Sequence, residues 1–163
     1  MPPLAYDMLE PMPPQQQDWT CSACSLAWLN RALQIDHATE EMSAAEYIGI
    51  TANINPTYGL MDSSGRRLAE CLAAQGAPAF CCWPSYDQVA DLATYMPLLA
   101  GGIAWNHWVG VRTAQAEGLL LANSAPGWQA VHQVLTRDDW QRLGPFAAVA
   151  VPLQRAFPTP SQG

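Results

Sequence analysis

The longest stretch of this sequence without a charged side chain covers residues 92–111 and is about as long as a membrane-spanning helix. It also contains Pro97, the pair Gly101-Gly102 and the polar pair Asn106-His107. Strongly polar groups are costly at membrane depth, and proline interrupts the hydrogen bonds of a helix. The sequence therefore predicts a loop that leads into a buried strand, and no membrane span.

Charged side chains are scarce in the whole chain of 163 residues, at 13% against about 25% in an average soluble domain. Acidic residues number 14 and basic residues 7, which gives a net charge of −7. Nucleic-acid binding is excluded because it needs clustered basic residues, and the only adjacent pair is Arg66-Arg67. Half of the residues are apolar, so the chain is not disordered, and its length predicts one domain over residues 1–163.

The five cysteines are odd in number, so they do not form a closed disulfide framework. The N-terminus also lacks the basic segment and apolar run of a secretory signal. Both observations predict a cytoplasmic location. The sequence gives no indication of the oligomeric state.

Helical patterns occupy the first half of the chain, and strand patterns dominate the second half. The proline-rich residues 1–14 are expected to form an extended arm, and residues 157–163 a frayed tail. Helices are predicted from residue 21 to about residue 33, from near residue 43, and over 64–75. Strands are predicted over 77–83, 108–113, 119–123, 129–135 and 146–151. Helices followed by an antiparallel sheet define an α+β fold.

Three short motifs predict helix starts. Ser43-x-x-Glu46 and Ser85-x-x-Gln88 have the pattern of a capping box, and Thr136-x-x-Asp139 has the shape of an N-terminal helix signal. The helical turn that the second motif opens should stop before Pro97. Gly76 follows the third predicted helix, where a left-handed backbone is favoured.

Cys21 lies at the start of the first predicted helix, which Asp18 or Thr20 is placed to cap. The unpaired N–H groups and the positive dipole end of a helix start favour the thiolate, the nucleophilic form of cysteine. Gln15, a few residues upstream, can direct its side-chain amide to the same place and donate to a developing oxyanion. This segment predicts a cysteine nucleophile, which also needs a base.

His107 is the histidine whose setting fits the base, because it lies at the head of a predicted strand. If this strand and the next pair about a turn centred on Gln115, Val111 lies opposite Leu119 and His107 lies opposite Asn123. Directly opposed residues share a face of the sheet, so Asn123 would fix the imidazole in the tautomer that presents its other nitrogen to the thiol. A register slip of one residue would replace Asn123 by the next residue.

A nucleophile at a helix start, followed along the chain by His and then Asn, resembles the papain-like cysteine peptidase superfamily. The closest pattern is that of the peptidases that cleave bacteriocin leader peptides after a double glycine, and of their stand-alone relatives. Their signature has Gln, five residues, Cys, and then a small residue before Leu-Ala, which Gln15, Cys21 and Ser25-Leu26-Ala27 match. Their His-aromatic-Val-x-Val run is similar to residues 107–111, and residues 135–140 resemble the helix before their last strand.

Two positions depart from that pattern. Ser22 follows the nucleophile where the leader peptidases usually have Gly, and Asn123-Ser124 stands where they have Asp-Pro, which is nearer to the papain branch. The run from Cys21 to Cys24 also resembles the Cys-Gly-Ser-Cys of papain relatives, in which the second Cys attacks. Cys24 is therefore an alternative nucleophile, although the residue six places before it is Asp18 rather than Gln.

Two other roles for the cysteines are considered. Cys21 and Cys24 are spaced like a thioredoxin-like redox pair, but no βαβ unit precedes them. A zinc site would draw on these two and on Cys81 and Cys82, and vicinal thiols do not easily point at one tetrahedral ion. No metal and no cofactor are expected.

The resemblance implies a papain-like fold, with an N-terminal helical part packed on a C-terminal antiparallel sheet, and a bacterial cysteine peptidase or amidase. Cys21 would attack the carbonyl, His107 would carry its proton, Asn123 would orient His107, and Gln15 would stabilise the oxyanion.

Trp19 and Trp128 lie next to the expected site in the sequence and are interpreted as an apolar wall for a peptide or protein substrate. Two further functions are considered. One is a catalytically silent peptide-binding module, and the other is a transpeptidase that passes the acyl group to an amine.

Overall fold

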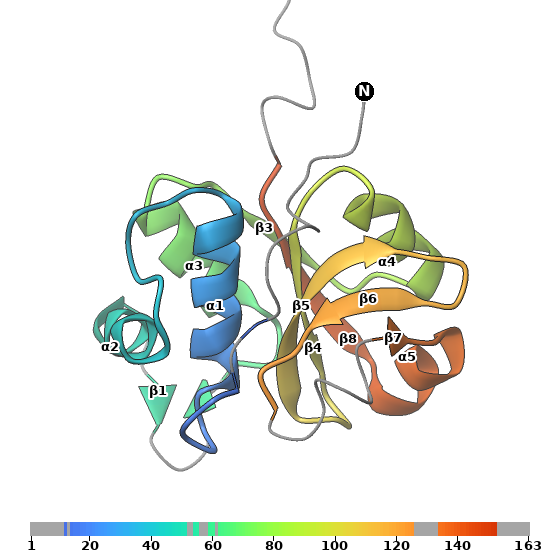
Figure 1. The fold of residues 1–163 in the computed structure, drawn as a ribbon, viewed down its shortest axis with the longest axis horizontal. Coiled ribbons are helices and arrows are strands. Elements are labelled where there is room, and N and C mark those ends of the chain that lie inside the picture. The colour runs from blue at the N-terminus through green and yellow to red at the C-terminus, as the bar shows by residue number, and fades with distance from the viewer. Residues whose placement is uncertain are drawn as a thin grey trace, which may run out of the picture.

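A computed structural model of the chain describes residues 12, 14–51, 54–55, 59–60, 62–125 and 134–152. Figure 1 shows the helices and strands of this part of the chain. They are α1 (Cys21–Ala32), α2 (Glu41–Thr51), β1 (Ile54–Asn55), β2 (Gly59–Leu60), α3 (Arg66–Ala74), β3 (Phe80–Cys82), α4 (Tyr86–Ala93), β4 (Leu98–Gly102), β5 (His107–Ala114), β6 (Leu119–Ala122), β7 (Val134–Leu135), α5 (Arg137–Leu143) and β8 (Phe146–Ala150).

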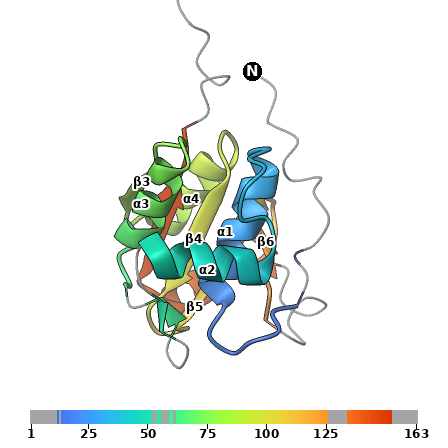
Figure 2. The same ribbon diagram turned by 90° about the vertical axis from the view of Figure 1, so that its left-hand side faces the viewer.

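The main sheet has six antiparallel strands in the order β3-β8-β4-β5-β6-β7, and β1 and β2 form a separate two-stranded sheet. Helices α1, α2 and α3 lie on one side of the main sheet, and α4 and α5 lie on the other (Figure 1). A view from the first side shows α2 crossing in front of α1 (Figure 2). The α+β class predicted from the sequence is confirmed.

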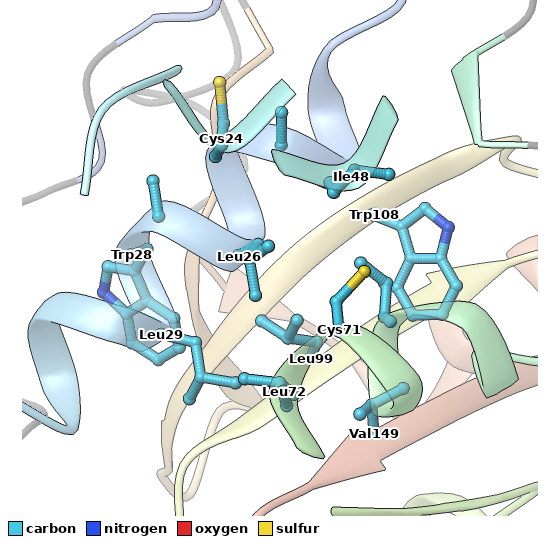
Figure 3. Close-up of a cluster of buried hydrophobic side chains, with 14 of the residues drawn as sticks. Cys24, Leu26, Trp28, Leu29, Ile48, Cys71, Leu72, Leu99, Trp108 and Val149 are labelled. Atoms are coloured by element: carbon cyan, nitrogen blue, oxygen red, sulfur yellow. The ribbon is translucent and has the colours of Figure 1, made fainter. Parts of the chain in front are cut away.

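Both faces of the main sheet are buried, because successive residues of its central strands pack into two different cores. Leu99, Trp108 and Val149 join the core built with α1, α2 and α3, part of which Figure 3 shows. Leu98 and Val109, their neighbours in the sequence, join the core built with α4 and α5. A strand that is buried on both faces has no position for a charged side chain. This burial explains the lack of charge over residues 98–102 and 108–111, the parts of the uncharged run that lie in β4 and β5.

The prediction of a loop before the buried strand is wrong, because residues 98–102 form the strand β4. Its sequence, Leu-Leu-Ala-Gly-Gly, contains no β-branched or aromatic residue and therefore carries little intrinsic strand preference. Pairing with β5 on one side and β8 on the other makes it a strand. No helix in the described ranges is long and apolar enough to cross a membrane.

Helix α1 packs closely on β5 because Gly110 leaves room for the indole of Trp28. A Cβ atom on Gly110 would lie 2.5 Å from that ring, well inside contact distance. Trp28, Leu26 and Leu29 are completely buried between α1 and the sheet (Figure 3). This contact fixes the axis of α1, and with it the position of its first residue.

Two of the predicted helix-start motifs are confirmed, since Ser85 and Thr136 form complete capping boxes at the starts of α4 and α5. The capping box predicted at Ser43 is wrong. Helix α2 begins at Glu41, two residues earlier, and the Ser43 hydroxyl donates to the carbonyl oxygen of Glu40 at 3.1 Å. The position before a helix and the position inside its first turn favour similar polar residues, which is why the motif misplaced this start.

The β5–β6 hairpin departs from its predicted register by two residues. Val111 pairs with Leu121 rather than with Leu119, because the turn is centred further along the chain and Ala114 pairs with Leu119. The register then shifts once more at a β-bulge between Val111 and Thr113. A shift of two residues keeps the side chains before the bulge, from His107 to Val111, on the face that was predicted, whereas Thr113 and Ala114 beyond the bulge change face relative to β6.

Several predictions fall wholly or partly outside the described residues. They concern the arm over 1–14, of which only Met12 and Pro14 are described, the tail over 157–163, and most of the strand over 129–135. The last two residues of that strand form β7. The strand predicted over 77–83 is present in shorter form as β3.

Candidate active site

Cys21 is the first residue of α1, the position expected from the sequence. Thr20 is the N-cap, but its side chain makes no capping hydrogen bond. Its backbone carbonyl oxygen accepts from the N–H of Cys24 at 2.9 Å and so starts the helix. The N–H groups of the first helical turn have no carbonyl partner within the helix and remain available near the half-buried thiol.

His107 begins β5 and is hydrogen-bonded to Asn123, which directly follows β6. The distance between His107 Nε2 and Asn123 Oδ1 is 2.7 Å. The two residues are diagonal rather than directly opposed neighbours in the corrected register, but they share a face of the sheet. The pairing inferred from the sequence is therefore present, although the register used to infer it is wrong.

Asn123 Oδ1 also accepts a hydrogen bond from the backbone N–H of Ala125, at 3.0 Å. An oxygen that accepts there is an acceptor for the histidine as well, so Nε2 of His107 carries the proton. The other ring nitrogen, Nδ1, is then unprotonated and can accept a proton from a thiol. This is the tautomer that a general base needs.

Cys21 and His107 line one cavity of about 520 Å³, together with Asp18, Trp19, Asp62 and Trp108 among others. The cavity lies between the start of α1, strand β2, and the ends of β4 and β5 that meet at Gly102 and His107. The backbone N–H of Trp108, the residue after His107, forms a hydrogen bond with the Cys21 sulfur. The fold thus brings the two sequence-predicted groups, 86 positions apart, to one place.

Burial sets the protonation of both groups. It raises the pKa of the Cys21 thiol above its ordinary value, and hydrogen bonds from the backbone N–H groups of Trp108, Ser22 and Cys21 only partly oppose this rise. It lowers the pKa of His107, which the hydrogen bond to Asn123 only partly restores. Both effects favour the neutral thiol and the neutral imidazole over their charged forms. The thiolate expected from the helix start alone is outweighed by burial.

The side chain of Gln15 is already engaged in two hydrogen bonds. Its Nε2 donates to the carbonyl oxygen of Gln17 at 2.7 Å, and its Oε1 accepts from the hydroxyl of Ser124 at 2.9 Å. Its backbone N–H also donates to the carbonyl oxygen of Ser124 at 2.7 Å. Gln15 is not among the residues that line the cavity. Its assignment as an oxyanion donor stays a prediction.

Cys24, the alternative nucleophile, lies away from the cavity that holds Cys21 and His107. It borders a second, much smaller cavity of about 80 Å³ beside Glu41. Burial, followed by the negative charge of Glu41, raises the pKa of its thiol to about 12. In Figure 3 its sulfur points away from Trp108. Its position separates Cys24 from His107, whereas Cys21 lines the same cavity as His107.

Trp19 lines the larger cavity, as expected for a substrate wall, whereas Trp128 lies outside the described residues. Three further lining groups were missed in the sequence: Asp62, the turn residue Ile103 and the strand β2. No pattern in the sequence marks them, because long-range packing alone brings them to the site. Ile103 is 47% exposed, unusual for a large apolar side chain at a cavity.

The described residues contain no group of three or more His, Cys, Asp or Glu side chains that could hold a metal ion. The four thiols considered for zinc are thus not gathered in one place. All five cysteines are free, which includes the Cys21 and Cys24 considered as a redox pair.

A helical layer with a cysteine at a helix start, packed on an antiparallel sheet that carries paired His and Asn residues, defines a class of fold. It is the fold of the papain-like cysteine peptidase domains, as two solved structures show.

One neighbour is the crystal structure of a double-glycine motif protease from an AMS/PCAT transporter in complex with the leader peptide. Its TM-score is 0.67 at 14% sequence identity, over 88% of this chain and 91% of that chain. Another is the peptidase domain of Streptococcus ComA, a bifunctional ABC transporter involved in quorum sensing. Its TM-score is 0.61 at 16% identity, over 86% of this chain and 97% of that chain. No protein-family model and no curated protein matches the sequence.

Proposed function

We propose that this chain is a cysteine peptidase or amidase with Cys21 as the nucleophile, His107 as the base and Asn123 as the residue that orients His107. The observation that carries the proposal is that Cys21 and His107 line one cavity, while His107 is hydrogen-bonded to Asn123. The protonated Nε2 of His107 leaves Nδ1 for the thiol proton, as general-base catalysis requires.

The reaction begins when the Cys21 sulfur attacks the substrate carbonyl carbon and its proton moves to His107 Nδ1. The backbone N–H of Cys21, with the side-chain amide of Gln15, stabilises the oxyanion. The C–N bond then breaks, and His107 gives its proton to the leaving amine, which leaves a thioester on Cys21. Water attacks this thioester while His107 takes a proton from the water; the C–S bond then breaks, the carboxylic acid product leaves, and His107 returns the proton to the Cys21 sulfur. Gln15 must exchange its bond to the Gln17 carbonyl for the oxyanion.

The substrate is a peptide or protein. The likeness of fold to a double-glycine protease held in complex with a leader peptide supports a cleavage site after two small residues. The cavity walls also support small substrate residues before the cleaved bond. Trp19 and Trp108 narrow the cavity, and Gly101 and Gly102 line it with backbone and carry no side chain. A bacterial origin and a cytoplasmic location belong to the same proposal.

Intact-mass measurement of acyl-enzyme and of alkylated protein tests the assignment. Wild-type protein incubated with Gly-Gly peptide esters should gain the mass of one acyl group, and tandem mass spectrometry should place it on Cys21. Cys21→Ser should abolish the adduct, whereas Cys71→Ser, a matched buried thiol in α3, should retain it. Cleavage that persists in Cys21→Ser would contradict the proposal.

The raised pKa of Cys21 favours a second candidate, a peptide-binding module without catalysis. Such a module would bind a Gly-Gly peptide in calorimetry, form no adduct and leave the peptide intact. The transpeptidase is distinguished by its product: with a peptide amine present, mass spectrometry would find the joined peptide rather than the free acid.

A further inference from the structure

We propose that Glu41, at the start of α2, is a positioning residue for the active site: its carboxylate holds residues 16–20, the loop that leads into Cys21. This inference rests on the function proposed above. It concerns a residue on a different helix, 20 positions from the nucleophile, that carries no part of the chemistry.

The contacts of Glu41 are directed at one segment. Its Oε1 accepts hydrogen bonds from the backbone N–H groups of Gln16 and Gln17, at 2.8 and 3.1 Å, and from the hydroxyl of Thr20, at 2.5 Å. Its Oε2 accepts from the N–H of Gln16 at 2.9 Å. Hydrogen bonds to a carboxylate are about twice as strong as neutral ones. One side chain therefore satisfies three donors of the loop.

Helix α2, which carries this carboxylate, is itself held in place by packing in the core. Ala44, Ala45 and Ile48 bury the helix against the core that also contains α1, and Figure 2 shows α2 lying across α1. Glu41 is the first residue of α2, where the helix N-terminus favours a negative charge. Glu41 thus connects residues 16–20 to α2, and α2 packs on α1, the helix that carries Cys21.

Thr20 links the carboxylate of Glu41 to the segment that carries Cys21. It is the N-cap of α1 and completely buried, yet its hydroxyl does not cap the helix. Its hydroxyl has one proton and two acceptors within reach, the Gln17 carbonyl oxygen at 2.8 Å and Glu41 Oε1 at 2.5 Å. The shorter contact to a charged acceptor is the stronger one. Glu41 therefore fixes the residue directly before Cys21.

The same loop supplies Asp18 and Trp19 to the cavity wall. Its far side is held by β2, where a Cβ atom on Gly59 would lie 2.9 Å from the Trp19 carbonyl oxygen. With Glu41 on one side and the backbone of β2 on the other, residues 16–20 have little freedom. Without Glu41, Cys21 and the loop would lose their common alignment, and such misplacement costs rate at the chemical step.

Steady-state kinetics with a Gly-Gly peptide substrate and amide hydrogen exchange test the proposal. The variants are Glu41→Ala, Glu41→Gln and the matched control Glu40→Gln, which changes an exposed neighbour whose contacts run through its backbone. Glu41→Ala should lower kcat by roughly 100-fold with a smaller change in KM. Glu41→Gln keeps one acceptor oxygen and should retain part of that rate, and Glu40→Gln should match wild type.

Hydrogen exchange reads the loop directly, without any activity. The N–H groups of Gln16 and Gln17 should lose protection in Glu41→Ala and keep it in Glu40→Gln. Wild-type kcat in Glu41→Ala, or unchanged protection of both N–H groups, would overturn the proposal. If Glu41→Ala fails to fold, Glu41→Gln, with nearly the same shape, decides by the same two measurements. A wild type without peptidase activity would reject the proposed function, while the exchange data would still decide the positioning.

Discussion

The Ser124 hydroxyl donates to Oε1 of Gln15 at 2.9 Å and so joins the residue after Asn123 to the segment before Cys21. The two residues are 109 positions apart in the chain, and a backbone hydrogen bond from Gln15 N–H to Ser124 O runs beside the side-chain contact. The side-chain contact also fixes the amide, because the oxygen faces Ser124 and the Nε2 group is left as the donor. Asn123 thus orients the imidazole of His107, and Ser124 orients the side-chain amide of Gln15; both are predicted catalytic groups.

Removal of the Ser124 hydroxyl tests this orientation. Ser124→Ala should lower kcat several-fold at nearly constant KM, because the Gln15 amide is then free to rotate away from the oxyanion. Gln15→Ala should lower kcat by about 100-fold, the usual loss for one oxyanion donor. Gln16→Ala, which keeps its backbone bonds to Glu41, is the control and should behave as wild type. Equal rates in Gln15→Ala and wild type would exclude Gln15 from the oxyanion hole.

The pH dependence of kcat/KM should reflect the lowered pKa of His107. Burial lowers the pKa of His107, so the base stays unprotonated down to below pH 6.5, and the acid limb lies below that value. Asn123→Asp places a negative charge beside Nε2, which favours the imidazolium and should move the acid limb to higher pH. Stopped-time assays between pH 4 and pH 9 are the measurement. An acid limb that stays in place would show that residue 123 does not act on His107.

Alkylation by iodoacetamide near neutral pH should separate the cysteines. Cys24 and Cys71 should both react slowly, because their thiols are buried and have pKa values of about 12 and about 11. Cys21, whose raised pKa disfavours the free thiolate, should depend on His107 as a base, and His107→Ala should slow it by about 100-fold. Exposed Cys81 serves as the internal control in each sample. Peptide mapping that finds equal slowing of Cys21 and Cys81 would point to a global change instead.

Charge at the cavity predicts a preference for basic peptides. Asp18 and Asp62 line the cavity, and no Lys or Arg does so among the described residues. A substrate with Arg near the cleaved bond should have a higher kcat/KM than its Glu counterpart, and the ratio should fall as salt screens the attraction. Asp18→Asn should reduce the ratio, whereas Asp36→Asn, an equal change at an exposed position outside the cavity lining, should not. A salt-independent ratio would contradict the electrostatic explanation.

Asp62 should also stabilise the start of α3. It accepts hydrogen bonds from the N–H groups of Ser64 and Arg67 and from the Ser64 hydroxyl. Burial alone would raise its pKa, but these hydrogen bonds outweigh it and lower the pKa below 3.8. Asp62→Ala should cost about 1 kcal/mol of unfolding free energy at neutral pH.

Because the folded-state pKa of Asp62 is depressed, its contribution is complete above the ordinary pKa and disappears as pH falls through the folded value. The difference in unfolding free energy between wild type and Asp62→Ala, measured by urea titration, should therefore shrink below about pH 3.8. A difference that is constant from pH 7 to pH 3 would show that the carboxylate charge has no part in it.

The sequence was sufficient for α1, for the starts of α4 and α5, and for the strands of the β5–β6 hairpin, because apolar periodicity and the capping boxes at Ser85 and Thr136 are local. It failed for β4, whose two leucines, alanine and two glycines become a strand only through pairing with β5 and β8. The register of the hairpin also failed, because the position of the turn and the bulge between Val111 and Thr113 are not visible in an alternating pattern.

At the site, Cys21 and His107 could be predicted because a helix start and a strand head give each of them a local setting. Asp62 and the Glu41 carboxylate could not, because their roles depend on contacts between distant segments. The effect of burial on Cys21 could not be predicted either, because burial is a property of the packed molecule; it raises the pKa of the thiol and so opposes the helix end.

The contact between the indole of Trp28 and Gly110 makes the geometry of the proposed active site sensitive to core packing. Cys21 lies on helix α1 and His107 on strand β5. The distance between the Cys21 sulfur and the His107 imidazole therefore depends on how α1 packs against the sheet. Any substitution that loosens this packing, even far from the cavity, should separate nucleophile from base before the protein unfolds. Catalysis would then be a more sensitive reporter of core packing than melting temperature, and an inactive variant would not by itself identify a catalytic residue.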